Sequence, residues 1–521
     1  LVPDLEAATF SGHESVDVEV HEAVDELVLH ALDLDITEAW LQQGDVRLDI
    51  TVALDAPSET ATFSLAGTAA PGSWTLHMAF TGQLNDKLVG FYRSTFTDDA
   101  GQVRTLATTQ FESTHARRAF PCWDEPAFKA SFAITLDVPD DLLAVSNAAE
   151  VSSEDLGGGR RRVRFATTMV MSTYLVAFVV GPLEASEAID VDGVPLRVIA
   201  PMGKADLTPF ALEAGAFSLR FLADWYAIPY PGDKLDLVAI PDFSFGAMEN
   251  LGCVTFRETA LLVDRDRATQ AELQRIADVV AHEIAHMWFG DLVTMNWWNG
   301  IWLNEAFATF MEMLTTDAFR PEWQRWVDFG LSRTAAFDTD SLSTTRPIEY
   351  EVVTAADAEG MFDVLTYEKG AAVLRMLEQY LGEEQFRAGV RLYLERHSYG
   401  NTRTTGARTP VPLRITHEQL TQLLHTHGAF SQRFGILLRQ ALLNRGKFSF
   451  RLFQTHTWFE PCHSTRIQSE VAAAIGRVWI SGVPLHHRCR PIIHWFFGHG
   501  ENARRGNADD LEFCFIKHHG L

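Results

Sequence analysis

The chain has 521 residues, of which 47% are hydrophobic, 11% aromatic and 21% charged, and its formal net charge is −26. These values exclude a disordered, collagen-like or disulfide-scaffold protein and argue against nucleic acid as a partner. Because a single core stops growing at about 250–300 residues, we expect more than one domain. The best membrane candidate, Met169 to Val180, is short and interrupted by Ser172 and Thr173, so we predict a buried strand and no membrane segment.

The five cysteines are odd in number and scattered. This argues against a disulfide framework and favours a reducing compartment such as the cytoplasm. No charged-then-apolar leader opens the chain. Its first residue is Leu1 rather than Met, so we expect the natural start to lie further upstream.

The first 180 residues predict β structure, because alternating or β-branched runs are separated by Pro, Gly and Asp turns. Two further runs flank three consecutive glycines and predict a hairpin. The predicted strands are Val16–Val20, Glu26–Leu34, Val46–Leu54, Ala61–Phe63 and Phe132–Val138, with the hairpin at Val151–Ser153 and Arg161–Thr167.

After Pro182 the pattern changes to short strands followed by long helical periods. We expect an all-β domain over residues 1–185 and an α+β domain over 186–405, with the helices gathered on one side of the sheet. The predicted strands are Leu196–Ile199, Leu235–Ala239 and Cys253–Phe256, and the predicted helices are Leu273–Phe289, Glu305–Ala318 and Tyr367–Leu381.

The composition changes abruptly near residue 405. Residues 1–400 hold 62 acidic and 28 basic side chains, whereas residues 401–521 hold 7 acidic and 15 basic ones and 11 of the 19 histidines. We expect that residues 406–521 do not belong with the first 400 residues of the protein. A shifted reading frame or a mis-joined fragment would produce such a segment. The alternative is a basic, histidine-rich binding segment or metal site, for which the candidates are His425/His427, Cys462/His463, His486/His487 and His518/His519.

The segment His282-Glu283-Ile284-Ala285-His286 lies inside a helical pattern. A spacing of four places both imidazoles on one helix face, where they can share a cation, and Glu283 can reach a water on that cation. Eighteen residues then separate His286 from Glu305, with Gly290 as a stop for the first helix, so a second antiparallel helix can present Glu305 to the same ion. Two imidazoles and one carboxylate leave a fourth position for water and favour zinc, with cobalt or manganese as possible replacements.

The chain resembles the zinc aminopeptidases of the aminopeptidase N and puromycin-sensitive aminopeptidase family. Six segments carry the resemblance, in order: Gln110-Phe111-Glu112, Arg117 to Pro126, Gly246-Ala247-Met248-Glu249-Asn250, the zinc motif, Trp302 to Ala308, and Tyr367-Glu368-Lys369-Gly370. The resemblance implies a saddle-like β sandwich followed by a thermolysin-like α+β zinc domain that is incomplete at its C-terminal end. The tail of residues 406–521 has no counterpart that we recognise.

The resemblance also implies the role of each site residue. His282, His286 and Glu305 would hold one zinc ion, Glu283 would act as general base, and Tyr367 would stabilise the oxyanion. The substrate would be a peptide with a free N-terminus, whose ammonium group is held by Glu112 and Glu249. Without the resemblance, Tyr367 would be interpreted as a core tyrosine at a helix start, and either Glu as a solvated surface acid.

Weaker implications concern the rest of the pocket. Gly246 and Ala247 would lie along the substrate backbone, and Gln110, Met248 and Phe245 would line the first side-chain pocket. Asp124 and Glu125, although part of a matching segment, are expected to be structural.

Three alternatives stay open at this point. One is an epoxide hydrolase with aminopeptidase activity, like leukotriene A4 hydrolase, although that subgroup typically carries Gly where Ala247 stands. A zinc endopeptidase of the thermolysin sort shares the zinc ligands but lacks the amine-binding pair. The third is a truncated, inactive fragment that binds zinc without turning over.

Overall fold

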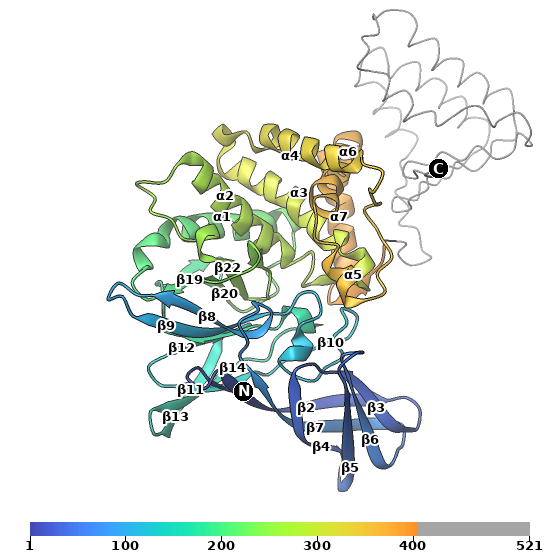
Figure 1. The fold of residues 1–521 in the computed structure, drawn as a ribbon. Coiled ribbons are helices and arrows are strands. Elements are labelled where there is room, and N and C mark those ends of the chain that lie inside the picture. Colours follow the sequence, from blue (N-terminus) through green and yellow to red (C-terminus); the bar gives the residue numbers. More distant parts are fainter. Residues whose placement is uncertain (405–521) are drawn as a thin grey trace, which may run out of the picture. The chain divides into compact units, whose positions relative to one another are not determined.

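Antiparallel strands form the N-terminal part of the chain (Figure 1). The computed structural model describes residues 1–404, so the predicted segment 406–521 and its histidine pairs lie outside the described residues. A seven-stranded sheet has the order β1-β2-β7-β4-β5-β6-β3. Alternation along its strands buries Phe10, Leu41, Phe63 and Leu76 on one face. Its strands are β1 Val2–Asp4, β2 Thr9–Val20, β3 Val24–His30, β4 Leu34–Gln43, β5 Val46–Asp55, β6 Thr60–Ala69 and β7 Gly72–Gln83.

Smaller sheets follow. A four-stranded sheet, β12-β16-β9-β8, and a three-stranded one, β11-β14-β13, cover residues 90–181 together with the pair β10 and β15. The turn between β13 and β14 has positive φ at Gly157, Gly158 and Gly159, which explains the three glycines there. Their strands are β8 Gly90–Thr97, β9 Val103–Gln110, β10 Lys129–Ala130, β11 Thr135–Pro139, β12 Leu143–Ser146, β13 Glu150–Gly157, β14 Arg160–Phe165, β15 Met171–Ser172 and β16 Phe178–Gly181.

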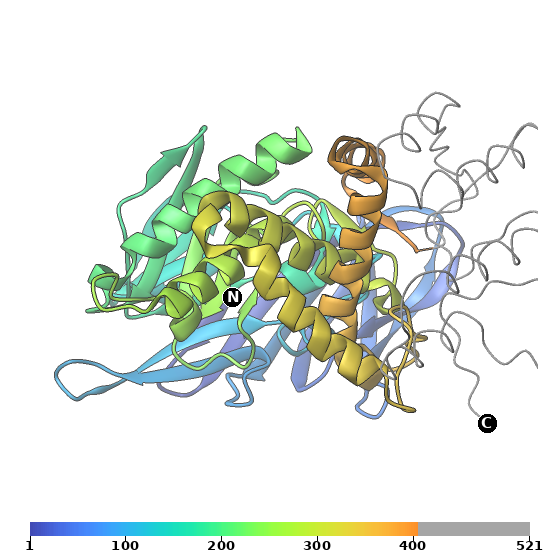
Figure 2. The same cartoon turned by 90° about the horizontal axis from the view of Figure 1, so that it is seen from above.

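A second part consists of a sheet with helices packed on one side (Figure 2). Its order is β17-β19-β20-β22-β21, with β18 beside β19, and the pairs β19/β20 and β20/β22 are parallel. All six residues of β20 are buried, as expected for a central parallel strand, and its one polar residue, Asp236, is paired with Arg197 and Lys234. The strands of this sheet are β17 Leu183–Ala185, β18 Ile189–Val191, β19 Val194–Pro201, β20 Leu235–Ile240, β21 Ala247–Met248 and β22 Cys253–Arg257. Two further strands, β23 Val293–Met295 and β24 Gly400–Thr402, form a separate parallel pair.

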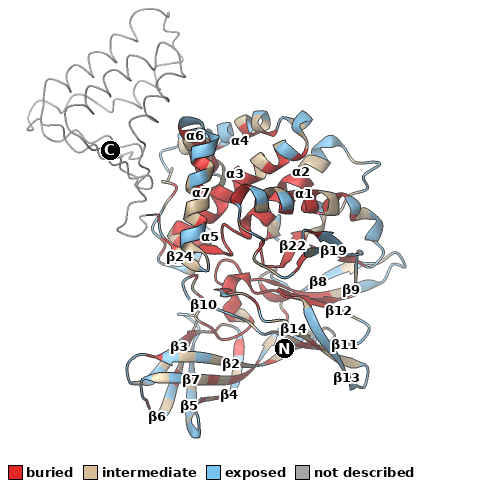
Figure 3. Ribbon diagram, turned by 180° about the vertical axis from the view of Figure 1, so that it is seen from behind, coloured by how far each residue is buried: buried red, intermediate tan, exposed pale blue. Residues whose placement is uncertain are grey.

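Seven α-helices of the described residues belong to this part and pack on one side of its sheet. They are α1 Pro209–Tyr226, α2 Gln270–His286, α3 Trp302–Phe319, α4 Arg325–Asp340, α5 Ala355–Glu359, α6 Gly370–Leu381 and α7 Glu383–His397. A capping box starts α2, in which Thr269 accepts from the N–H of Glu272 and Glu272 accepts from the N–H of Thr269. Buried residues concentrate between the helices and the sheet (Figure 3). Within residues 1–404, no helix is both long and apolar enough to cross a bilayer.

The β-then-α+β fold class predicted from the sequence is confirmed, with three local corrections. The predicted strand Glu26–Leu34 is two strands, because the chain leaves β3 after His30 to bond with Cys122 and turns at Asp33. In the segment from Met169 to Val180, residues 171–180 are buried but Val170 is exposed. The segment is not one strand, since a 3-10 turn at Thr173–Leu175 separates β15 from β16. Helix α2 ends at His286 rather than Phe289, where the backbone tightens into an i−3 hydrogen bond.

A buried lysine forms hydrogen bonds with both the β-rich part and the helical part. Lys234, which is 5% exposed, donates at 2.6 Å to the carbonyls of Ser146 in β12 and of Gly252 ahead of β22. Its ammonium group also lies 2.9 Å from Asp236. Asn147 adds a hydrogen bond to the carbonyl of Leu251 at 2.9 Å. The two parts are therefore joined by buried polar contacts. Strand β17, which ends at the predicted boundary of residue 185, pairs with β19 and so already belongs to the sheet of the second part.

Replacing Lys234 should destabilise the fold because the buried carbonyls of Ser146 and Gly252 each lose a charged donor, and Asp236 keeps Arg197 as its one ion-pair partner among the described residues. We expect Lys234→Met to lower the free energy of unfolding by about 3 kcal/mol in a urea titration. Lys204→Met is the matched control, since its ion pair with Glu258 is partly exposed and should contribute below about 1 kcal/mol. If both variants lost the same free energy of unfolding, Lys234 would not be a residue that stabilises the contact between the two parts.

Candidate active site

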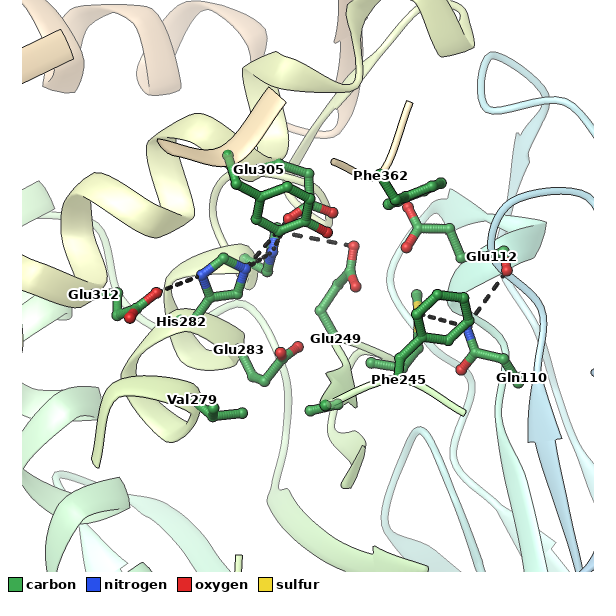
Figure 4. A pocket seen from close by; sticks show the side chains of 15 residues that line it. Gln110, Glu112, Phe245, Glu249, Val279, His282, Glu283, Glu305, Glu312 and Phe362 are labelled. Atoms are coloured by element: carbon green, nitrogen blue, oxygen red, sulfur yellow. Dashed lines mark hydrogen bonds and ion pairs between the residues drawn. The ribbon is translucent and has the colours of Figure 1, made fainter. Parts of the chain in front are cut away.

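Two adjacent helices bring two imidazoles and one carboxylate together (Figure 4). His282 and His286 lie one turn apart on α2, and Glu305 lies in the first turn of α3. The Nε2 atoms of the histidines are 3.0 Å apart, and each is 3.3 Å from Oε2 of Glu305. The eighteen residues between His286 and Glu305 contain β23 and a 3-10 turn at Trp298–Gly300, which reverse the chain into α3. The sequence-predicted ligand set is thus one cluster.

This cluster fits a tetrahedral divalent ion. An ion with bonds of about 2.0–2.1 Å holds neighbouring ligands about 3.3 Å apart, close to the three observed spacings. The atoms of His282, His286 and Glu305 form a group able to hold a metal ion. Imidazole and carboxylate donors without thiolate match zinc.

Both histidines are oriented by a second partner on Nδ1. The Nδ1–H of His286 donates to the carbonyl of Phe289 at 2.9 Å, and that of His282 donates to Oε2 of Glu312 at 3.0 Å. These bonds place the ring proton on Nδ1 and leave Nε2 free for a metal. Sequence analysis did not identify Glu312. Its position seven residues after Glu305, on the same face of α3, was the available signal.

The buried charges of the cluster interact strongly. Burial alone would raise the pKa of Glu305, but the two imidazoles lower it to about 2. Burial alone would lower the pKa of His282, but the carboxylates of Glu305 and Glu312 raise it well above its usual value. Burial raises the pKa of the neighbouring Glu283 to about 8, against the opposing effect of both imidazoles.

A pocket of about 260 Å³ surrounds the cluster. Every site residue predicted from the sequence lines it: Gln110, Glu112, Gly246, Ala247, Met248, Glu249, His282, Glu283, His286, Glu305 and Tyr367, together with Phe245. Three lining residues were missed, namely Val279, Glu312 and Phe362. Asp124 does not line the pocket and is paired with Arg117 at 2.9 Å, a structural contact.

Two acids from different parts of the fold lie at one end of this pocket. Glu112 follows β9 and Glu249 follows β21, and one oxygen of each lies within 4.8 Å of the other and of a Glu305 oxygen. Both side chains are buried, and Oε1 of each has no hydrogen-bond partner among the described residues. Burial, and for Glu112 also the charge of Glu249, raises the pKa of each carboxyl. In Figure 4, Glu112 and Gln110 lie on one side of the histidines, and Glu312 and Val279 on the other.

An open strand edge passes along the pocket. Ala247 and Met248 form β21, which pairs with β22 on one side and ends the sheet on the other. The carbonyl of Gly246 accepts a hydrogen bond from Arg257 at 2.9 Å, and a Cβ at Gly246 would meet no atom within 4 Å. Within residues 1–404, β21 is therefore an edge strand with one unpaired side, and the space next to Gly246 is open.

Tyr367 lies beside the cluster in a π-helical turn, Leu365–Lys369, just before α6. Its ring stacks on His282 with centroids 5.9 Å apart and planes 13° apart. Oδ1 of Asp363 accepts from the backbone N–H groups that begin the turn and from Arg346 at 2.7 Å. Such π-helical turns are frequent at functional sites, and this one is held from outside by a charged pair.

Glu312 should control metal affinity through His282. We expect Glu312→Gln to weaken metal binding about 10- to 100-fold, because the neutral amide oxygen accepts a weaker hydrogen bond from Nδ1–H of His282 than a carboxylate does and adds no negative charge to the imidazole. Competition with a chelator measures the affinity. Asp317→Asn, on the same helix and away from the cluster, should leave it unchanged. If wild type and Glu312→Gln bound the metal with equal affinity, Glu312 would have no role in orienting His282.

The sequence was compared with known families and proteins. Residues 210–411 match the Peptidase family M1 domain, and residues 1–175 match the Peptidase M1 N-terminal domain. Aminopeptidase M1-D of Oryza sativa subsp. japonica is 45% identical over 405 residues, covering 78% of this chain and 46% of the relative. Aminopeptidase M1 of Arabidopsis thaliana is 44% identical over 409 residues, with the same coverage.

Puromycin-sensitive aminopeptidase of Caenorhabditis elegans is 44% identical over 408 residues, covering 78% of this chain and 43% of the relative. The chain thus spans less than half the length of these curated relatives. The two domain matches together cover well over half of the 521 residues. The chain therefore belongs to peptidase family M1.

Proposed function

We propose that this chain carries the active site of a zinc aminopeptidase, which removes the first residue from peptides with a free N-terminus. One observation carries the proposal: Glu112 and Glu249 each present a buried carboxylate oxygen that accepts no hydrogen bond from the described residues, in the same pocket as the His282 cluster. Among the described residues, the basic atom nearest to that oxygen of Glu249 is Nδ1 of His286, at 3.9 Å. Relatives that bear the name aminopeptidase agree with it.

The two acids would select the end of a chain. A buried carboxylate without a partner is costly, and an α-ammonium group offers the charge and the three donors that would satisfy Glu112 and Glu249. An internal peptide segment has no cation at this position and would leave both acids unpaired. This disfavours the endopeptidase alternative, which has no use for the pair.

His282, His286 and Glu305 would hold zinc, which when bound acts as a Lewis acid and lowers the pKa of a water molecule towards about 7. Glu283 lies beside the cluster on α2 without belonging to it. We assign it as the base that takes the proton of the attacking water and returns it to the departing amine.

The remaining residues would position the peptide. Tyr367 would donate a hydrogen bond to the carbonyl oxygen as negative charge develops on it. Gly246, Ala247 and Met248 would pair with the substrate backbone along the free edge of β21. Gln110, Met248 and Phe245 would line the first side-chain pocket, to which the structure adds Phe362 opposite Phe245, with ring centroids 6.5 Å apart.

We also propose 1–185 and 186–405 as the domain limits and the cytoplasm as the location. The family matches, which end at 175 and begin at 210, support a boundary between these positions. Cys122 and Cys253 are buried and free, which supports a reducing compartment.

Amine recognition predicts a difference between two substrates. With zinc supplied, the 521-residue chain should hydrolyse an unblocked aminoacyl-arylamide, and N-acetylation should lower kcat/KM by about 100-fold or more, since it leaves two buried carboxylates unpaired. Release of the arylamine measures both rates. Equal rates would remove the exopeptidase assignment, and a zinc-loaded chain without any turnover would favour the alternative of an inactive fragment.

Because metal binding and proton transfer are assigned to different residues, substitutions should be able to abolish turnover without loss of the metal. Glu283→Gln should retain bound zinc while lowering kcat by at least about 100-fold, because the amide cannot accept the water's proton. Tyr367→Phe should lower kcat by about 100- to 1,000-fold and also keep the metal. Metal analysis and steady-state kinetics on the same samples test both. A metal-free Glu283→Gln protein would contradict the separation between base and ligands.

A further inference from the structure

The loop that carries Glu112 is tied to the helical part of the chain by Glu359. The backbone N–H of Ser113 donates to Oε1 of Glu359 at 3.2 Å, and the Ser113 hydroxyl donates to the same oxygen at 2.9 Å. His115 Nε2 lies 3.6 Å from that oxygen. Glu359 is the last residue of α5 and belongs to the helical part of the chain, whereas the loop follows β9 of the β-rich part. Three groups of one loop thus converge on a single carboxylate oxygen.

The base of this loop is held by the β-rich part. Phe111 is fully buried and lies edge-on to Phe120 and Phe178, with ring centroids 5.9 Å away in both cases. Its carbonyl accepts from the N–H of His115 at 2.8 Å, which closes the loop into a tight turn. The loop therefore has a rigid base in one part of the fold, and its Ser113 backbone is fixed to the other.

Glu359 is also close in sequence to pocket residues. Phe362, three residues later, lines the pocket, and Tyr367 follows within the next turn of chain. Glu112 directly precedes Ser113, and Phe362 follows Glu359 by three residues. The contact between Ser113 and Glu359 therefore links the position of Glu112 to that of the pocket residue Phe362. The acid and the wall come from different parts of the fold, so their spacing depends on a contact of this kind.

We propose that Glu359 is a positioning residue for amine recognition: by accepting both hydrogen bonds of Ser113, it holds Glu112 at the distance from the metal cluster at which a substrate's ammonium group can bridge Glu112 and Glu249. The proposal rests on the proposed aminopeptidase function. Glu359 touches neither the substrate nor the metal ligands in this arrangement. Its loss should therefore weaken the binding of the amine while leaving the chemistry of the bound substrate intact.

The hydrogen bonds, rather than the charge of Glu359, should matter. Glu359→Ala should raise KM for an unblocked aminoacyl-arylamide about tenfold and leave kcat within about twofold, since it removes two bonds to a carboxylate. Glu359→Gln keeps an accepting oxygen and should restore KM to within about threefold of wild type. Ser113→Ala keeps the N–H donor and should fall between the two. Glu351→Ala, an exposed acid shortly before α5, is the matched control and should behave as wild type.

A double-variant comparison tests the coupling to Glu112. If Glu359 acts through Glu112, adding Glu359→Ala to Glu112→Gln should raise KM by less than about twofold. Full additivity would overturn the proposal, and so would an unchanged KM in Glu359→Ala or a Glu359→Gln variant as impaired as Glu359→Ala. A parallel fall in kcat with unchanged KM would equally contradict a role in amine binding.

A binding measurement separates this proposal from the proposed function. Leucine hydroxamate and its N-acetylated form can be titrated into the zinc-loaded chain by calorimetry, without any turnover. The preference for the unblocked ligand should fall about tenfold in Glu359→Ala, with zinc affinity unchanged. If wild type prefers the unblocked ligand but hydrolyses nothing, the positioning role survives and the proposed activity fails. An equal preference in wild type and Glu359→Ala would overturn the positioning role alone.

Discussion

The organising constraint of this site is an excess of buried negative charge. Five carboxyl groups line one pocket of about 260 Å³, and they belong to Glu112, Glu249, Glu283, Glu305 and Glu312. Two imidazoles are the basic side chains that line it with them. Desolvated acids this close together either take up protons or require cations. A divalent ion at the histidines and an ammonium group at the neighbouring pair Glu112 and Glu249 would supply that charge, so the same constraint would account for both the proposed metal binding and the proposed choice of substrate.

The fold distributes these charges between two structural parts. The metal cluster belongs to α2 and α3, whose register is fixed within the helical part. The amine end is composite, because Glu249 comes from the edge of the catalytic sheet and Glu112 from a loop of the β-rich part. Contacts across this boundary, through Lys234 at one place and Glu359 at another, are therefore part of the site's construction. A small shift between the parts would leave the metal cluster intact and alter the amine pocket.

The sequence predicted what depends on local spacing and matching segments: the histidine pair, Glu305, and the β-then-α+β order of the fold. It could not predict contacts made through tertiary structure, such as those of Phe362 and Glu359, whose neighbours lie far away in the chain. Glu312 could have been found from its spacing to Glu305 on one face of α3. Helix α1 was missed because it is buried on several faces and its apolar period is blurred. The 3-10 turn within the run from Met169 to Val180 begins at Thr173, where the sequence shows a polar interruption. It was missed because two polar residues within an apolar run do not distinguish a turn from polar positions of a strand.

The central claim is that a metal ion and a free amine occupy neighbouring positions in one acidic pocket. A crystal structure of the zinc-loaded chain with leucine hydroxamate, recorded at the zinc absorption edge, tests it most directly. We predict an anomalous peak bound by His282, His286 and Glu305, and the ligand's ammonium nitrogen within hydrogen-bonding distance of Glu112 and Glu249. A peak away from the histidines, or an ammonium group turned away from both acids, would contradict the account.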